Sequence, residues 1–383
     1  MSTINELKLE MINWRHHIHA HPETAFEEIN TTKFIIEKLK SFGITELYTE
    51  FAPTGVVGII KGNKDGRWIA LRADIDALDI IEENDMAYCS TITGKMHACG
   101  HDGHTATLLG TAKYLSEHRD FAGTVVVIFQ PAEENEGGAR VMVENGLFER
   151  FPIQAVYGIH NQPNMKLNHF YVTHGPMMAS YDVFEIKITG VGAHAAAPHL
   201  SKDTILTATQ IVNGLQSIVS RNADPLSALV VSVTQIHSGD TWNVIPQQAV
   251  IRGTVRTFDA QVQDMAENRI KQIATGIAST FEAKAEVDYQ RRYPATINYV
   301  KQAEIAIKAA KKAVGESHVI IDPNPSMGAE DFAFMLKKIP GAYVWLGAGE
   351  GANLHNPAYN FNDEVLTTGV EYFIEIVHQE LGK

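Results

Sequence analysis

The sequence has only two cysteines among its 383 residues, Cys89 and Cys99. Small disulfide-stabilised folds carry many cysteines at regular spacings, so the composition excludes that class. One small disulfide loop would add little to a chain of this size, and we expect both thiols to be reduced. Cys99 lies among three histidines in GKMHACGHDGH, residues 94–104, which raises the question of what its thiol does.

Long hydrophobic runs are also missing. No segment approaches the roughly 20 apolar residues that a membrane-spanning helix requires. The N-terminal stretch MSTINELKLEMINWRHHIHAHPE has no run of about 7–15 apolar residues, which a secretory signal peptide would need. We therefore expect a cytoplasmic protein.

The chain lacks an excess of positive charge. It has 32 Lys and Arg against 45 Asp and Glu, a formal net charge of −13. Without a basic field, nucleic acid and anionic membrane are excluded as the main partners. A small substrate experiences only the local field of its pocket, so this class of partner stays open.

The patterns that are present predict an α/β protein with an insertion. A chain of 42.2 kDa suggests two domains. Apolar runs such as TVVVIFQ and AVYGI alternate with helical patterns, which indicates strands buried on both faces of a mainly parallel sheet. Residues 1–180 and 296–383 form this domain. Residues 181–295 follow the order β-α-β-β-α-β, which predicts an inserted ferredoxin-like α+β domain.

Polar side chains follow several of the predicted strands. In open α/β sheets, ligands bind beyond the carboxyl ends of the strands, so these residues are expected to share one edge of the sheet. They offer carboxylate, imidazole and thiolate groups, and the thiolate stands just before a predicted helix. The residues concerned are Asp74, Asp76, Cys99, His101, Glu133, Glu134, His160 and His355.

This combination of side chains predicts a metal centre. Its candidate ligands exceed the four that one tetrahedral zinc takes. Two bridged ions, roughly 3.5–4 Å apart, would use them. A thiolate favours zinc over magnesium or calcium, and imidazoles also admit manganese, nickel or cobalt. The candidate ligands are Cys99, His101, Glu134, His160 and His355.

The same residues admit other interpretations. A lone buried cysteine is most often a small core hydrophobe. As a nucleophile, Cys99 would leave the cluster of carboxylates and histidines without a purpose, and Cys89 has no motif that links it to a redox pair. The histidines of the first helix, residues 16–21, are expected to be surface or packing residues. GVGAH lacks the third glycine of a dinucleotide fingerprint.

A set of motifs then resembles one family, the M20 metallopeptidase superfamily. The likeness is strongest to the amidohydrolase branch, which includes hippurate hydrolases, N-acyl amino-acid deacylases and plant auxin-conjugate hydrolases. It covers essentially the whole chain, and the order of the motifs is specific. They are RADIDAL, MHACGHDGHTA, QPAEE, GIHNQP, GVGAHAAAPH, NVIP, GTVRTF, MGAEDF and LHNP.

The resemblance implies roles for individual residues. Cys99 takes the place of a bridging ligand, and the four other candidate ligands take the remaining ligand places. Glu133 falls where the family has its general base, and Asp76 where a carboxylate steadies the metal site. In the insertion, a lid that often dimerises, the positions implicated in substrate binding are His194, Asn243 and Arg256.

The function implied by the resemblance is hydrolysis of the amide bond of an N-acyl amino acid by a two-metal enzyme, often dimeric. An N-acetyldiaminopimelate-type deacetylase and a dipeptidase are alternatives within the same chemistry, and a catalytically inactive metal-dependent binding protein is an alternative outside it. Asp79 stands where the branch usually has proline, a departure that removes no expected ligand.

Overall fold

The computed structural model describes residues 3–134 and 136–382; residues 1, 2, 135 and 383 of the segments predicted above lie outside the described residues. The chain divides into two compact units. Unit 1 comprises Met1–Met177, Ile297–Asn324 and Asp331–Lys383, and unit 2 comprises Met178–Thr296 and Pro325–Glu330.

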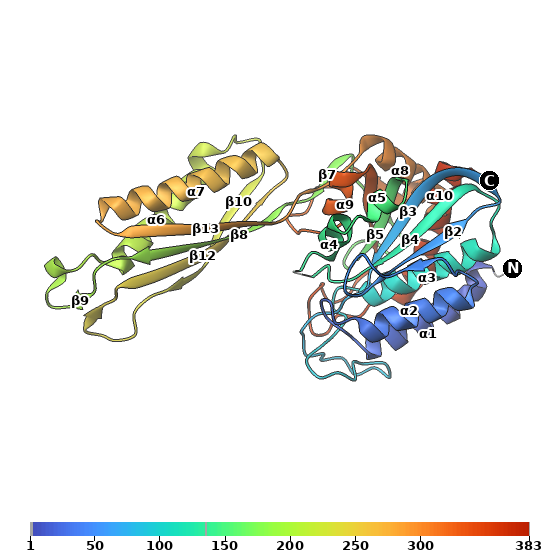
Figure 1. Ribbon diagram of the computed structural model, residues 1–383, viewed down its shortest axis with the longest axis horizontal. Coiled ribbons are helices and arrows are strands. Elements are labelled where there is room, and N and C mark those ends of the chain that lie inside the picture. The colour runs from blue at the N-terminus through green and yellow to red at the C-terminus, as the bar shows by residue number, and fades with distance from the viewer. Residues whose placement is uncertain (1–2, 135, 383) are drawn as a thin grey trace. The chain divides into compact units, whose positions relative to one another are not determined.

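Unit 1 is built around an eight-stranded sheet (Figure 1). Across the sheet the order is β1 (Leu47–Tyr48), β2 (Val56–Lys61), β4 (Ala122–Gln130), β3 (Lys64–Asp74), β5 (Ile153–Gln162), β16 (Gly341–Gly347), β6 (Phe170–Val172) and β15 (Val319–Ile321). The central strands β4, β3, β5 and β16 are parallel. The predicted α/β class with a mainly parallel sheet is confirmed.

Helices cover both faces of this sheet. The helices are α1 (Ile4–Ala20), α2 (Ile29–Ser41), α3 (His101–Glu117), α4 (Gly138–Glu144), α5 (Leu147–Arg150), α8 (Val300–Val314), α9 (Ala333–Lys338) and α10 (Leu366–Leu381). Helices α2, α3, α8 and α10 pack on one face with α1 alongside, and α4 and α9 pack on the other. In the described ranges, none of the helices is both long enough and apolar enough to cross a membrane.

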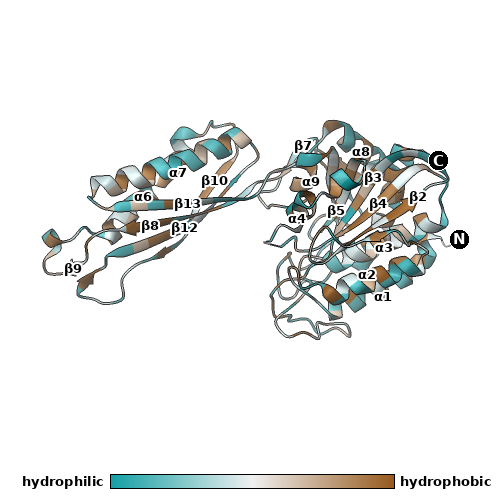
Figure 2. Cartoon of the chain, viewed as in Figure 1, coloured by the Kyte–Doolittle hydropathy of each residue, from teal (hydrophilic) through white to brown (hydrophobic). Residues whose placement is uncertain are grey.

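Alternation along the strands explains why both faces are covered. Successive strand residues point to opposite faces of the sheet. A strand that is covered on both faces is therefore apolar at most of its positions, without alternation of apolar and polar residues. On β3, Ile69, Leu71 and Ala73 join the core formed with α1, α2, α3, α8 and α10. Ala70 and Arg72, between them, are equally buried. Figure 2 shows the hydrophobic colouring that runs along these strands.

Helix α1 follows directly from its sequence. Thr3 and Glu6 form a reciprocal capping box that satisfies backbone donors at the first turn. Leu7, Met11, Trp14 and Ile18 recur at helical spacing, and all four are buried. These four residues form an apolar stripe, which is the face of α1 that packs against the core.

Unit 2 is a four-stranded antiparallel sheet covered on one face by two helices (Figure 1). In chain order its main elements are β8 (Tyr181–Thr189), α6 (Thr204–Ser217), β10 (Leu229–His237), β12 (Gln248–Thr257), α7 (Ala260–Thr280) and β13 (Lys284–Tyr293). The strand order β10-β12-β8-β13 is the ferredoxin-like order. On β8 the inward residues Phe184, Ile186 and Ile188 are buried against the helices.

Short elements complete the chain. They are β7 (Gly175–Met178), β9 (Ala193–His194), β11 (Val244–Ile245), β14 (Thr296–Asn298), the 3-10 turns η1 (Pro198–Leu200), η3 (Glu316–His318) and η4 (Asp363–Val365), and the π-turn η2 (Ile218–Asn222). β9 and β11 form a separate two-stranded ladder in unit 2.

Asp182 on β8 is a buried carboxylate of unit 2. Tyr289 donates its hydroxyl to Oδ2 at 2.6 Å, and Gln263 donates its amide to both oxygens at 2.9 Å. Burial raises the pKa of Asp182 above its ordinary value, although these hydrogen bonds oppose the shift. The folded protein therefore holds this proton at pH values where the unfolded chain has lost it.

We expect Asp182 to make unit 2 less stable as pH rises. Because the folded pKa is raised, the free energy of unfolding begins to fall as the pH rises above the ordinary aspartate pKa of about 3.9. It continues to fall until the pH has passed the pKa of the folded state, and then levels off. The asparagine in Asp182→Asn does not titrate, so the stability of this variant relative to the wild type should increase over the same pH range. Hydrogen exchange of β8 and β13 in urea, from pH 4 to 7, measures this difference.

The matched control is Glu185→Gln on the exposed face of β8, where Glu185 pairs with Arg252 at 2.6 Å. This exposed pair should give a much smaller pH dependence, since solvent screens it. A pH profile of Asp182→Asn that parallels the wild type would contradict the prediction.

Candidate metal centre

Unit 1 gathers polar side chains at the carboxyl edge of its parallel strands. β3 ends at Asp74 and is followed by Asp76, and β4 is followed by Glu133 and Glu134. His160 lies near the end of β5. Because these neighbouring strands run in the same direction, their ends bring carboxylates and imidazole to one place.

Cys99 and His101 lie at the start of α3. The sequence predicted this helix after His104, but it begins at His101, because Gly100 turns the chain in the left-handed conformation at φ 95°. A Cβ at residue 100 would lie 2.3 Å from Oδ1 of Asn161, so only glycine fits there. The thiol and the imidazole are thus held on a glycine-dependent turn.

The predicted metal ligands form overlapping groups of donor atoms. Donors of Cys99, His101 and His160 lie within 4.8 Å of one another, and so do those of Cys99, Glu134 and His355. Sγ of Cys99 is 3.4 Å from Nε2 of His160, and Nε2 of His355 is 3.1 Å from Oε1 of Glu134. Cys99 belongs to both groups, which is the position that a bridging thiolate would occupy.

Asp76 connects two of these donors. Its Oδ1 lies 3.1 Å from Nδ1 of His101, and its Oδ2 accepts a 2.9 Å hydrogen bond from the backbone N–H of Glu134. Nε2 of His101 is buried and has no hydrogen-bond partner among the described residues. An imidazole that is oriented by a carboxylate at one nitrogen and makes no hydrogen bond at the other is arranged as metal-binding histidines are.

Glu133 is buried beside this cluster. Its Oε1 accepts a 3.3 Å hydrogen bond from the backbone N–H of Asp331. A carboxylate oxygen of Glu133 lies within 4.8 Å of donors of His101 and Glu134, but Glu133 does not share a group with Cys99. It is therefore placed next to the donors that surround the thiol.

The loop after β16 brings His355 to the same place. Its backbone is left-handed at φ 63°, and its N–H donates to the carbonyl of Ala98 at 2.8 Å. This bond ties the loop to the residue before Cys99. Left-handed conformations at residues other than glycine cost energy and are found where surrounding contacts enforce them, often at functional sites.

Burial and neighbouring charges shift the pKa values of the cluster in different directions. Burial raises the pKa of the Cys99 thiol, and Glu134 raises it further. Burial lowers the pKa of His160 well below its ordinary value. Hydrogen bonds to Cys99 and Glu134 raise the pKa of His355 to about 10. Since thiolate and neutral imidazole are the metal-binding forms, metal uptake at this cluster must release protons.

Sequence reasoning missed His104, which links two strand ends behind the cluster. Its Nδ1 lies 2.6 Å from Oδ1 of Asp74, and its Nε2 lies 2.7 Å from Oδ1 of Asn161. Arg72 holds the other oxygen of Asp74 at 2.7 Å. The spacing of His101 and His104 on one helix face was the available signal.

A second missed network joins α1 to the start of α3. The buried Asp102 accepts from Arg15 at 2.8 Å, and its Oδ2 lies 2.8 Å from Nδ1 of His19. The guanidinium of Arg15 is the main cause that holds the pKa of Asp102 low against its burial. Arg15 and His19 follow Met11 at intervals of four residues, so helical spacing had placed them beside the apolar stripe. The expectation that the histidines of α1 only pack or face solvent is too simple for His19.

Asp79, which replaces the proline usual in the branch, is exposed. Reciprocal backbone hydrogen bonds between Leu78 and Met96, at 2.9 and 3.0 Å, fix the chain just before it. The departure therefore lies outside the polar cluster.

The three predicted substrate-binding residues lie in unit 2. His194 on β9 is paired with Val244 on β11, and the carbonyl of Asn243 accepts from Ala195 at 3.0 Å. Arg256 lies on β12 with its guanidinium 4.2 Å from the centre of the Tyr181 ring. His194 and Asn243 are thus close neighbours within unit 2.

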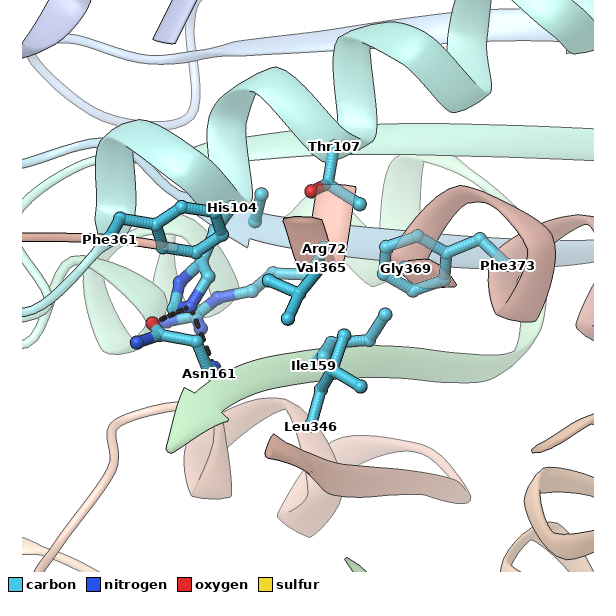
Figure 3. Close-up of a pocket in the computed structure, with 11 residues that line it drawn as sticks. Arg72, His104, Thr107, Ile159, Asn161, Leu346, Phe361, Val365, Gly369 and Phe373 are labelled. Carbon is cyan, nitrogen blue, oxygen red and sulfur yellow. Dashed lines mark hydrogen bonds between the residues drawn. The ribbon is translucent and has the colours of Figure 1, made fainter. Parts of the chain in front are cut away.

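A small cavity lies behind His104 and Asn161 (Figure 3). Its volume of about 10 Å³ is close to what one water requires, so it cannot hold a substrate. Apolar side chains of β5, β16 and α10 line the rest, including Ile159, Leu346 and Phe373. The cavity is a packing feature of the scaffold that supports the cluster.

Fold and site together define a class of protein. An α/β sheet whose strand ends present thiol, imidazole and carboxylate donors in two overlapping groups, with a further buried carboxylate beside them, is typical of metal-dependent hydrolases with two ions. The chain belongs to peptidase family M20/M25/M40, whose family model matches residues 70–379. The predicted resemblance is confirmed.

Individual relatives cover nearly the whole chain. It is 43% identical over 367 residues to N-acetylcysteine deacetylase of Bacillus subtilis (strain 168), covering 96% of this chain and 95% of that protein. It is 40% identical over 373 residues to hippurate hydrolase of Campylobacter jejuni, covering 97% of both. The solved YXEP protein of Bacillus subtilis, described as a dinuclear metal-binding peptidase from the M20 family, is 38% identical with a TM-score of 0.86, covering 97% of this chain and 98% of that one. Together with the donor groups, this neighbour supports a site for two divalent metal ions.

Proposed function

We propose that the protein is a metal-dependent amidohydrolase that cleaves N-acyl amino acids to a carboxylate and a free amino acid. The observation that carries the proposal is the placement of the buried Glu133 beside two donor groups that share Cys99. The activities named for the relatives, deacetylation of N-acetylcysteine and hydrolysis of hippurate, are both reactions of this kind.

We assign the metal positions to Cys99, His101, Glu134, His160 and His355. Zinc or manganese fits this mixture of thiolate, imidazole and carboxylate, and nickel and cobalt are compatible with it. When bound, two such ions polarise the amide carbonyl and acidify a water molecule. Asp76 orients His101 and the backbone of Glu134, and so steadies the geometry of the site.

Glu133 is assigned as the general base and acid. An amide resists hydrolysis because water is a weak nucleophile and the departing amine needs a proton. A carboxylate beside the reacting atoms can take the proton from water and later give it to the nitrogen. The hydrogen bond from Asp331 holds Oε1 of Glu133 in position for this transfer.

Substrate binding is assigned to residues of unit 2. Arg256 pairs with no carboxylate of the described residues, so its guanidinium is available for the two oxygens of an amino-acid carboxylate. His194 is assigned as a donor to the oxyanion that develops on the carbonyl, and Asn243 stands beside it in the β9–β11 region. We propose that unit 2 acts as a lid and dimerisation domain in a cytoplasmic homodimer or higher homo-oligomer, in which His194 serves its own or the neighbouring subunit's site.

A substrate panel tests the proposal. N-acetyl, N-benzoyl and indoleacetyl amino acids are incubated with protein loaded with zinc or manganese, and with a chelated sample in parallel. We expect metal-dependent release of free amino acid from some members, and no release after chelation. The ranking of acyl groups then identifies the preferred substrate.

A negative result with every substrate of the panel would also be informative. No release from any member, with two ions verified per chain, would contradict the general N-acyl amino-acid assignment. Dipeptides and N-acetyldiaminopimelate, tested next, would then distinguish a dipeptidase from a specialised deacetylase.

A further inference from the structure

The residue before Glu133 has a strained backbone. Ala132 is left-handed at φ 53°, a conformation that residues with a Cβ rarely adopt. It is buried between Pro131 and the two glutamates, Glu133 and Glu134. The direction in which both glutamates leave the end of β4 therefore depends on a turn that alanine does not favour by itself.

A buried carboxylate holds this turn. Oε1 of Glu28 accepts a 2.9 Å hydrogen bond from the backbone N–H of Ala132, and its Oε2 accepts a 2.5 Å hydrogen bond from the hydroxyl of Thr54. The carbonyl of Ala132 accepts from the N–H of Gly138 at 2.8 Å. Both backbone polar groups of the strained residue are therefore engaged, one of them by a side chain 104 residues away.

Burying this carboxylate is costly, and helix capping does not explain it. Glu28 has no exposed surface, and none of the described Lys or Arg residues forms an ion pair with it. Burial raises its pKa to about 7. Although Glu28 occupies the N-cap position of α2, its side chain makes no capping hydrogen bond. Its two oxygens are engaged by Ala132 and Thr54 instead.

We propose that Glu28 is a positioning residue: its buried carboxylate holds Ala132 in the left-handed conformation and thereby aims Glu133 and Glu134 into the metal centre. The inference rests on the proposed roles of these two glutamates. Glu28 touches no reacting atom. It acts through the peptide N–H of Ala132, which no other side chain of the described residues binds.

The first experiment compares Glu28→Ala with Glu28→Gln. Glutamine keeps a carbonyl that can accept from Ala132, whereas alanine removes the acceptor. We expect Glu28→Ala to lower kcat roughly 10- to 100-fold, as displacement of a catalytic group by about 1 Å does. KM should stay within about threefold, and Glu28→Gln should recover most of the kcat. A kcat loss in Glu28→Gln equal to that in Glu28→Ala would overturn the proposal.

A double substitution tests whether Glu28 acts through the strained turn. Glycine adopts positive φ without strain, so Ala132→Gly removes the need for an external restraint. Glu28→Ala lowers kcat by some factor in each background. We expect this factor to be at least about threefold smaller in the Ala132→Gly background than in the wild type. An equal loss in both backgrounds would overturn the mechanism.

Two measurements do not depend on catalysis. In the metal-free protein, deuterium exchange of the peptide containing Ala132 should be faster in Glu28→Ala and Thr54→Val than in the wild type, because the hydrogen bond to Ala132 is lost or loosened. Chelator competition should show weaker binding of one zinc ion in Glu28→Ala. Unchanged exchange and unchanged zinc affinity would overturn the inference even if the substrate panel had failed.

The matched control is Glu380→Gln on α10. Glu380 is also a buried glutamate, accepting from the hydroxyl of Tyr157 at 2.6 Å and pairing with Arg67, but it has no contact with residues 131–134. It should lower the temperature of unfolding without changing the kcat or the exchange of the Ala132 peptide. If Glu380→Gln reduced kcat as much as Glu28→Ala, general loosening of unit 1 would replace positioning as the explanation.

Discussion

Glu133→Gln is expected to lower kcat by roughly 10²- to 10⁴-fold, the range by which a positioned general base accelerates proton transfer. Glutamine has nearly the same shape, and its carbonyl can still accept the N–H of Asp331. It cannot take up a proton. Because Glu133 is not assigned as a metal ligand, both ions should remain bound, KM should change by less than about threefold, and the temperature of unfolding should not fall.

The measurement combines steady-state kinetics on the best substrate of the panel with metal analysis and thermal unfolding. Glu136→Gln is the matched control, because Glu136 is an exposed carboxylate only three residues along the chain. It should leave kcat unchanged. Undiminished turnover in Glu133→Gln would contradict its assignment as the base. Loss of an ion together with activity would make Glu133 a ligand instead.

Cys99→Ala is expected to show the second large effect, a loss of metal affinity. Removing even an outer partner of a metal ligand typically weakens metal binding 10- to 100-fold. Removing a ligand that belongs to both donor groups should therefore lower the affinity for at least one ion by more than about 100-fold. At limiting metal concentration, turnover should be abolished. Isothermal titration of the metal-free protein with zinc measures the affinity.

Cys99→Asp distinguishes a ligand from a nucleophile. A carboxylate can bridge two ions as a thiolate can, so this variant should regain much of the metal affinity and part of the turnover. A cysteine nucleophile could not be replaced in this way. Cys89→Ala is the control, since the hydrogen bonds that the Cys89 thiol makes within the described residues are to backbone atoms of Asn84 and Met86. If Cys99→Ala bound both ions with wild-type affinity and were inactive, the nucleophile hypothesis would replace the ligand hypothesis.

The α/β class could be predicted because it depends on local patterns. Apolar runs such as 125–129 and 155–159 contain no charged residue, and this is the sequence signature of strands covered on both faces. The convergence of polar residues at one edge followed from the same patterns, since parallel strands end side by side. The start of α3 was misplaced by four residues, because a left-handed glycine rather than a capping side chain begins the helix.

The sequence by itself determined which residues offer donors and which strand ends carry them, because strand direction and the types of side chain are local properties. Only the tertiary structure decided how those donors are held. The pairs Arg15 with Asp102 and Glu28 with Ala132 join residues 87 and 104 positions apart, and no periodicity encodes such partners. Burial against the end of β4 places the carboxylate of Glu28 where it accepts from the hydroxyl of Thr54 and from the strained peptide in front of Glu133.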